Sequence, residues 1–279
     1  MKPTSIALCS SAAILILLFV RMDSKATAQS AVADRPLPAA SFLETVHQNL
    51  ARQYDDAFLL DGFTYHVKTT RDEMTADGKL KARKRSDYDV IYNNGVLQKL
   101  ASKDGTSSGS KDAVPTKQAP IAADEKSRQE AIREAKAVVD DIFRVMNLRI
   151  VRREIIRDRP AIVVEFSPRN NVKPQTRDGK RVLTRVQGFA WVDETDHVLA
   201  RIELHLIEDY KQDGPLAVKI EKGGEIIRDW LKFRDEIWLP ASETRHLTLN
   251  SLGKKIQVQR TEYSDYKKFS SETTIKVIE

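Results

Sequence analysis

The sequence is poor in cysteine, and this lack excludes several kinds of structure and chemistry. The one cysteine among 279 residues is Cys9, close to the N-terminus. Once an N-terminal leader is removed, as expected below, the chain has no thiol. Disulfide bonds, thiolate nucleophiles and cysteine metal sites are then excluded. The fold must rest on a hydrophobic core, and about 250 residues are enough for one sizeable core.

Several enzyme motifs are also missing. The sequence contains no GxSxG, P-loop or GxGxxG pattern, and its 5 histidines are scattered without the HExxH spacing of a zinc site. The pair Gly223-Gly224 lies between strand-like segments, where a hairpin turn explains it. We therefore expect a protein that is not an enzyme, with no catalytic residue, no metal ligand and no cofactor. A hydrolase whose site is assembled across space is kept as a third hypothesis.

Charge of one sign is not concentrated anywhere. The net charge is +6, from 46 basic and 40 acidic side chains, and the two signs are interspersed along the chain. Aromatic residues are not interleaved with basic ones, so no nucleic-acid partner is expected. A weak attraction to an anionic membrane surface is compatible with this charge.

The N-terminus resembles a secretory signal peptide. Lys2 precedes an apolar run over residues 6–20, which is shorter than the roughly 20 residues of a membrane-spanning helix. Small residues follow at Ala26-Thr27-Ala28, so residues 1–28 are predicted to be cleaved before Gln29. The protein is then exported to the periplasm; the alternative is an uncleaved anchor in the inner membrane.

Two amphipathic helices are predicted in the remaining chain. Residues 29–40 are rich in alanine and proline and are expected to be a flexible lead-in. Ser41 and Glu44 form a capping box, and apolar residues at helical spacing continue to about Asp55. Ser127 and Glu130 form a second capping box for a helix over about residues 126–146.

The other segments alternate with a period of two, which is typical of half-buried strands. Turn residues separate them at short intervals, for example at residues 93–95, 178–179, 193–196 and 223–224. Residues 103–123 are rich in Ser, Gly, Lys and Pro and are expected to be a mobile insertion. The pattern predicts an α+β, mainly β domain over residues 41–279. In this domain a curved antiparallel sheet forms an unclosed half-barrel, and the amphipathic helices cover it.

Three short stretches resemble the LolA/LolB/RseB-like superfamily of periplasmic lipoprotein carriers. They are GFAWVDETDHVLARI at residues 188–202, WLP at residues 238–240 and DYKKF at residues 265–269. The order of parts is also similar, from signal peptide through helix, hairpins and helical cover to a long meander. The resemblance implies an unclosed barrel whose inner surface and helical lid hold acyl chains.

We therefore expect the protein to bind a lipid, or the acyl chains of a lipoprotein, in an apolar concavity between the sheet and a helical lid. The alternative is an envelope protein-interaction or stress-sensing module of the same fold without a lipid. The expected partners are thus a lipid or acylated protein, and otherwise a membrane surface or an envelope protein. The residues expected to bind lipid are Val139, Ile142, Phe143, Ile162, Val164, Phe166, Trp191, Leu204 and Leu206.

Overall fold

The computed structural model describes residues 35–58, 63–93, 96–101, 125–211, 218–250 and 253–268. The expected signal peptide, most of the lead-in and the expected insertion at 103–123 lie outside the described residues. At the start of the described chain, the buried Arg153 side chain donates hydrogen bonds to the carbonyl oxygens of Arg35 and Pro36, at 2.8 and 3.1 Å.

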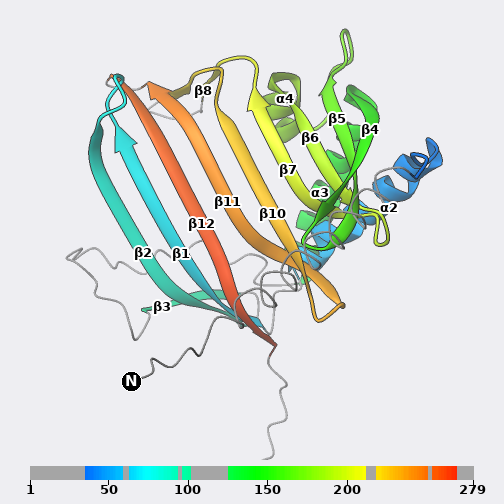
Figure 1. The fold of residues 1–279 in the computed structure, drawn as a ribbon, viewed down its shortest axis with the longest axis horizontal. Helices are drawn as coiled ribbons and strands as arrows, with labels where there is room; N and C mark the ends of the chain where they lie inside the picture. Colours follow the sequence, from blue (N-terminus) through cyan, green and yellow to red (C-terminus); the bar gives the residue numbers. More distant parts are fainter. Residues whose placement is uncertain are drawn as a thin grey trace, which may run out of the picture.

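A single antiparallel sheet of 12 strands dominates the described chain, in the order β3-β2-β1-β12-β11-β10-β7-β6-β5-β4, with the short β8 and β9 beside β11. It is strongly curved and does not close (Figure 1), so the predicted unclosed half-barrel is confirmed. The strands are β1 Phe63–Met74, β2 Leu80–Asn93, β3 Val96–Ala101, β4 Met146–Ile156, β5 Arg159–Pro168, β6 Val186–Asp193, β7 Leu199–Leu206, β8 Tyr210–Lys211, β9 Lys219–Ile220, β10 Glu225–Phe233, β11 Ile237–Asn250 and β12 Lys254–Lys268.

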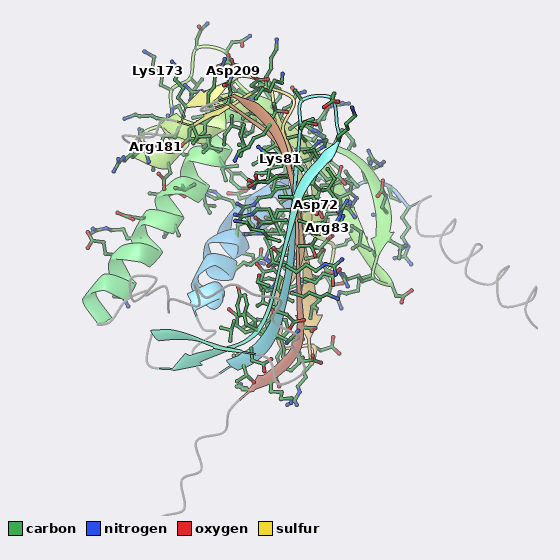
Figure 2. The ribbon with its side chains drawn as sticks, turned by 90° about the vertical axis from the view of Figure 1, so that its left-hand side faces the viewer. Asp72, Lys81, Arg83, Lys173, Arg181 and Asp209 are labelled. Atoms are coloured by element: carbon green, nitrogen blue, oxygen red, sulfur yellow. The ribbon has the colours of Figure 1, made fainter. Side chains whose placement is uncertain are left out.

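Two long helices lie on one side of this sheet (Figure 2). They are α2 Ser41–Phe58 and α3 Glu125–Val145, close to the predicted ranges. The two predicted caps have different outcomes. α2 begins at Ser41, where the capping pattern placed its start, and the N–H groups of Phe42 and Leu43 donate to the carbonyl oxygens of Ala39 and Ala40. Ser127 lies inside α3 rather than at its start, so the second predicted cap is wrong.

A short helix replaces a predicted turn. Residues 178–179 belong to α4 Arg177–Val182, which continues into the 3₁₀ turn Leu183–Arg185. The Thr176 hydroxyl caps α4 by accepting a hydrogen bond from the Gly179 N–H at 3.0 Å. A Cβ on Gly179 would lie 2.7 Å from a carboxylate oxygen of Asp141. The glycine is therefore needed for a close approach, and not for a turn.

Candidate functional site

Strand pairing identifies the sheet face that the helices cover. Directly paired residues in an antiparallel sheet point to the same face. One row of such pairs crosses the sheet from β4 to β2: Ile150, Val164, Ala190, Ile202, Arg228, Glu243, Thr261, Thr69 and Ser86. Val164 packs against side chains of α2 and α3. The row therefore lies on the face beneath the helices, which we call the helix face.

The character of the helix face changes across the sheet. The next row reads Leu148, Phe166, Gly188, Leu204, Ile226, Arg245, Gln259, Arg71 and Lys84. In both rows the residues on β4–β7 are apolar or glycine, whereas those on β11, β12, β1 and β2 are polar or charged. We call the β4–β7 part the apolar half, and the part formed by β10, β11, β12, β1 and β2 the polar half.

Side chains from both helices fill the space over the apolar half. Phe42, Val46 and Leu50 of α2 and Val139 of α3 pack on Ile162 and Val164. Both Val139 and Ile162 are 0% exposed. Phe143 of α3 also stacks on His47 of α2, with ring centroids 4.3 Å apart. In this arrangement the helices and sheet form a packed core.

The polar half contains a carboxylate held between two arginines. Arg228 Nε donates to Glu243 Oε2 at 2.9 Å, and Arg245 Nε lies 2.5 Å from Glu243 Oε1. The Glu243 side chain is 6% exposed, whereas those of Arg228 and Arg245 are each 42% exposed. Since a guanidinium has five N–H donors, both arginines keep donors for a group outside the sheet. The cluster carries an excess of one positive charge.

More hydrogen-bond donors extend from this cluster toward the sheet edge. Arg71 donates to Gln259 Oε1 from Nε and Nη2, at 3.0 and 2.8 Å. The hydroxyls of Thr69 and Thr261 lie 3.3 Å apart, and Lys84 is exposed beside Arg71. This arrangement of cations and hydroxyls suits an anionic group, because charge-assisted hydrogen bonds to phosphate or carboxylate are strong.

An aromatic cluster continues the core toward β1 and β12. Its buried members are Phe63, Tyr65, Val67, Val90, Leu239 and Tyr266. The Tyr266 hydroxyl donates to the Pro240 carbonyl oxygen at 2.7 Å. Burial raises the pKa of Tyr266 and of the neighbouring Tyr263. Both phenols are therefore neutral hydrogen-bonding groups at physiological pH.

A few polar contacts join α2 to α3 and to the start of β7. Gln53 of α2 bonds both to the N–H and to the carbonyl oxygen of Leu199, at 2.9 and 3.0 Å. His47 of α2 lies 2.8 Å from Asp140 of α3. Elsewhere α2 and α3 pack through apolar side chains. The hydrophobic effect that stabilises these contacts does not require a particular orientation.

The C-terminal end of α3 is anchored by a buried carboxylate. Asp141, which is 2% exposed, accepts hydrogen bonds from the backbone N–H groups of Gln175 and Thr176 and from the Thr176 hydroxyl, at 2.6–3.0 Å. Arg144 forms an ion pair with the same carboxylate. Burial alone would raise the pKa of Asp141, but these hydrogen bonds lower it to about 2. Asp141 is therefore a charged structural anchor between α3 and the segment before α4.

The residues expected to bind lipid lie in three core clusters. Val139, Ile162 and Val164 share a cluster with Phe143, and Phe166 shares another with Ile142, Leu204 and Leu206. These eight belong to the helix side of the sheet. Trp191 does not, because it pairs with Val163 and Arg201 and packs with Ala161 and Val163 on the opposite face. Its inclusion was wrong: Ala190 and Val192, the residues on either side of it, point to the helices.

The opposite face is polar and rich in ion pairs. Asp72 of β1 and Arg83 of β2 form a bidentate pair at 2.6 and 2.8 Å, on the side of the sheet away from α2 and α3 (Figure 2). His66 lies between Asp87 and Asp89, 2.9 Å from each. The hydrogen bond to Asp89 is the main cause of the raised pKa of His66. This histidine thus has two carboxylate partners on the neighbouring strand, β2.

Sequence reasoning missed the charged residues of the polar half. Arg228, Glu243 and Arg245 alternate with their neighbours as surface strand residues do, so nothing local distinguishes them. The pairing of β10 with β11 brings them together. In retrospect, one weak signal was the pair of charges at positions 243 and 245, which share a face in a long strand.

The described residues contain neither a metal-binding cluster nor a helix suited to crossing a membrane. No group of three or more His, Cys, Asp or Glu side chains is placed to hold a metal ion there. None of the helices in the described part of the chain combines the length and hydrophobicity needed to span a membrane.

Comparison with known proteins gives structural matches only. No protein-family model matches the chain, and no curated protein matches it. A LolA superfamily protein from Nitrosomonas europaea is 13% identical, over 80% of this chain and 94% of its own, with a TM-score of 0.30. A DUF1329 family protein from Desulfovibrio piger is 11% identical, over 82% and 93% of the two chains, with a TM-score of 0.30.

A third similar structure is the complex of MucA and MucB from Pseudomonas aeruginosa. The identity is 10%, over 81% of this chain and 99% of that chain, with a TM-score of 0.26. The LolA superfamily, named above from sequence motifs, thus recurs among the similar structures. At these identities and TM-scores, function has to be argued from the residues of this chain.

Proposed function

We propose that the chain is an exported, non-catalytic carrier whose helix face binds a lipid or the acyl chains of a lipoprotein. The observation that supports this proposal is the division of one sheet face into an apolar half beneath two helices and a cationic half beside it. An amphiphile has the same two parts. Its acyl chains suit the apolar half, and an anionic headgroup suits the donors of Arg228 and Arg245.

In this proposal α2 and α3 act as a lid. Val139 and Ile162 are 0% exposed, so acyl chains enter only when the helices move away from the sheet. Burying one apolar side chain is worth about 1.5–3 kcal/mol, and burying one methylene about 0.8 kcal/mol. An acyl chain of about 15 methylenes, worth roughly 12 kcal/mol, therefore compares with the contacts of five or six helix side chains. The free energy gained by burying the acyl chain is thus similar to the free energy lost when the helix side chains leave the sheet.

Two neighbouring valines allow a matched test. Val163 and Val164 are 0% and 3% exposed, and they point to opposite faces of β5. A valine-to-threonine change nearly keeps the shape but introduces a hydroxyl, so each variant is expected to lose about 1–3 kcal/mol of unfolding free energy. Only Val164→Thr is expected to weaken binding of a fluorescent hexadecanoic acid probe, several-fold. The absence of probe binding to the wild type, or equal weakening by Val163→Thr, would contradict the proposal.

A second candidate function is an envelope protein-interaction or stress-sensing module without a lipid. The complete burial of Val139 and Ile162 favours it, because the helix–sheet interface is already filled by side chains. Native mass spectrometry of protein purified from its own envelope fraction separates the two candidates. A bound lipid mass supports the carrier, and a lipid-free complex with a second polypeptide supports the module.

A further inference from the structure

The sheet has a pocket at one end of its strands, lined in part by residues of β4, β5 and β7. Three connections lie at this end of the strands: β4–β5, β6–β7 and β10–β11. They share one end because successive strands in this part of the sheet are antiparallel. There a pocket of ≈ 290 Å³ is lined by Trp230, Trp238, Arg157, Asp158, Lys232 and Asp235, among others. The pocket therefore joins segments that are far apart in the sequence.

Two of the 3 tryptophans of the chain line this pocket. Trp238 donates from Nε1 to Asp196 Oδ2 at 2.9 Å, so its indole has a fixed orientation. The guanidinium of Arg159 lies 5.6 Å from the centroid of the Trp238 ring. Both Trp230 and Trp238 are only half-buried. They offer apolar ring surface to a molecule in the pocket.

The cations at the pocket are neutralised by carboxylates. Arg159 makes two hydrogen bonds to Asp193, at 2.6 and 3.0 Å, and one to Asp196 at 3.0 Å. Lys232 Nζ lies 2.8 Å from Asp196. The exposed Arg157 is accompanied by Asp158 and Asp235, which also line the pocket. Three cations thus face four carboxylates, Asp158, Asp193, Asp196 and Asp235, so no cation is left over to bind an anion. Together with the aromatic surface, this favours a neutral ligand.

The turns beside the pocket have an unusual backbone. Arg157 and Asp158 have φ angles of 50° and 63°, and Arg234 and Asp235 have φ angles of 50° and 58°. Tight hairpin turns with two residues at positive φ normally contain Asn-Gly or Asp-Gly, because a side chain is strained there. The Arg-Asp pair occurs at both turns. Arg157, Asp158 and Asp235 thus line the pocket from backbone positions where glycine or asparagine is usual.

We propose that this pocket binds a neutral saccharide through one pyranose ring. The C–H face of a pyranose packs on an indole ring, and its hydroxyls bond to carboxylates, guanidinium and ammonium groups that are already held in place. The volume of ≈ 290 Å³ accommodates a ring of this size. The proposal does not depend on the proposed carrier function.

The test is titration of the purified protein with methyl glucoside, maltose and di-N-acetylchitobiose, followed by tryptophan fluorescence and calorimetry. Saturable binding in the millimolar range or tighter is expected. Trp238→Ala and Trp230→Ala are each expected to weaken binding by roughly tenfold or more. Trp191→Phe is the matched control, because Trp191 packs in another cluster, and it should bind as the wild type does.

Asp235→Asn provides a second test, in a variant that is expected to fold like the wild type. Asp235 has an 89% exposed side chain, so this change should leave the unfolding free energy unaltered while weakening binding several-fold. The proposal is overturned if no neutral saccharide binds, if Trp191→Phe loses binding while the pocket variants keep it, or if Asp235→Asn binds as the wild type does. Stronger binding of glucuronate than of methyl glucoside would overturn the assignment to a neutral ligand.

Discussion

The apolar and polar halves of the helix face are formed by strands of one sheet, yet they are stabilised in opposite ways. On β4–β7, side chains such as Ile162 are completely covered by the helices. On β10–β12 and β1, the same positions carry Arg228, Glu243 and Arg71, which are stabilised by ion pairs and hydrogen bonds. The comparison teaches that the inner side of an open sheet need not be a continuous apolar core. In the two rows of paired residues, the side chains beneath α2 and α3 are apolar, and those on β11, β12, β1 and β2 are polar or charged.

The largest expected effect tests the contrast directly. Ile162→Ala in the apolar half should lower the unfolding free energy by about 2–5 kcal/mol, because the fully buried site leaves a cavity. Thr69→Ala in the polar half should lower it by about 1 kcal/mol or less, since it removes one long hydrogen bond in a half-buried position. Urea unfolding of both variants measures the difference. Equal losses would mean that the two halves are packed alike.

A smaller effect concerns the buried carboxylate that anchors α3. The pKa of Asp141 is lowered from 3.8 to about 2, so its contribution to stability is complete above pH 3.8 and is lost as the pH falls toward 2. This contribution is about 2–3 kcal/mol. Asp141→Asn should therefore be less stable at neutral pH and should lack this part of the pH dependence between pH 4 and 2, as measured by thermal unfolding.

The neighbouring Asp140→Asn is the control for this prediction. Asp140 has a 56% exposed side chain that lies 2.8 Å from His47. Its replacement should change the unfolding free energy by about 0.5 kcal/mol or less. A loss as large as that of Asp141→Asn would show that charge on α3, and not the buried anchor, stabilises the helix.

The smallest effect on stability is expected in the polar half. Arg71→Gln and Lys84→Gln change exposed side chains, so the unfolding free energy should change by about 0.5 kcal/mol or less. Under the carrier proposal, the double variant should bind dodecyl phosphate roughly tenfold more weakly. Binding of the net-neutral dodecyl dimethylamine oxide should be unchanged. Calorimetry measures the binding of both amphiphiles to the double variant. Equal weakening of both would rule out an anion site.

Much of the fold was predictable from local pattern. The helix predicted to run from Ser41 to about Asp55 is observed over Ser41–Phe58, and the predicted hairpin at 87–100 is formed by β2 and β3. These predictions succeeded because helical and strand periodicities are read within a few residues. Thr176 and Asp141 show the limit of this reading. Their hydrogen bond joins residues that are 35 apart in the sequence. Thr176 also caps α4, the helix observed where a turn was predicted.

The candidate site was predictable only in part, because periodicity divides a strand into two sets of residues without saying which set faces inward. Val164 was assigned to the helix side and lies there, whereas Trp191 was assigned to that side and lies on the other. Trp191 has a larger apolar surface than its neighbour Ala190. Hydrophobicity therefore assigned Trp191, and not Ala190, to the helix side. The register that pairs Trp191 with Val163 decides its face.

The amino-acid sequence by itself determined that this chain forms two amphipathic helices and a series of antiparallel hairpins, since these depend on residues close together in the chain. Only the tertiary structure decided which strand faces meet the helices. It also placed Glu243 between two arginines and brought Trp230, Trp238 and Arg159 to one pocket. Such arrangements depend on strand order and register over distances that no local pattern records.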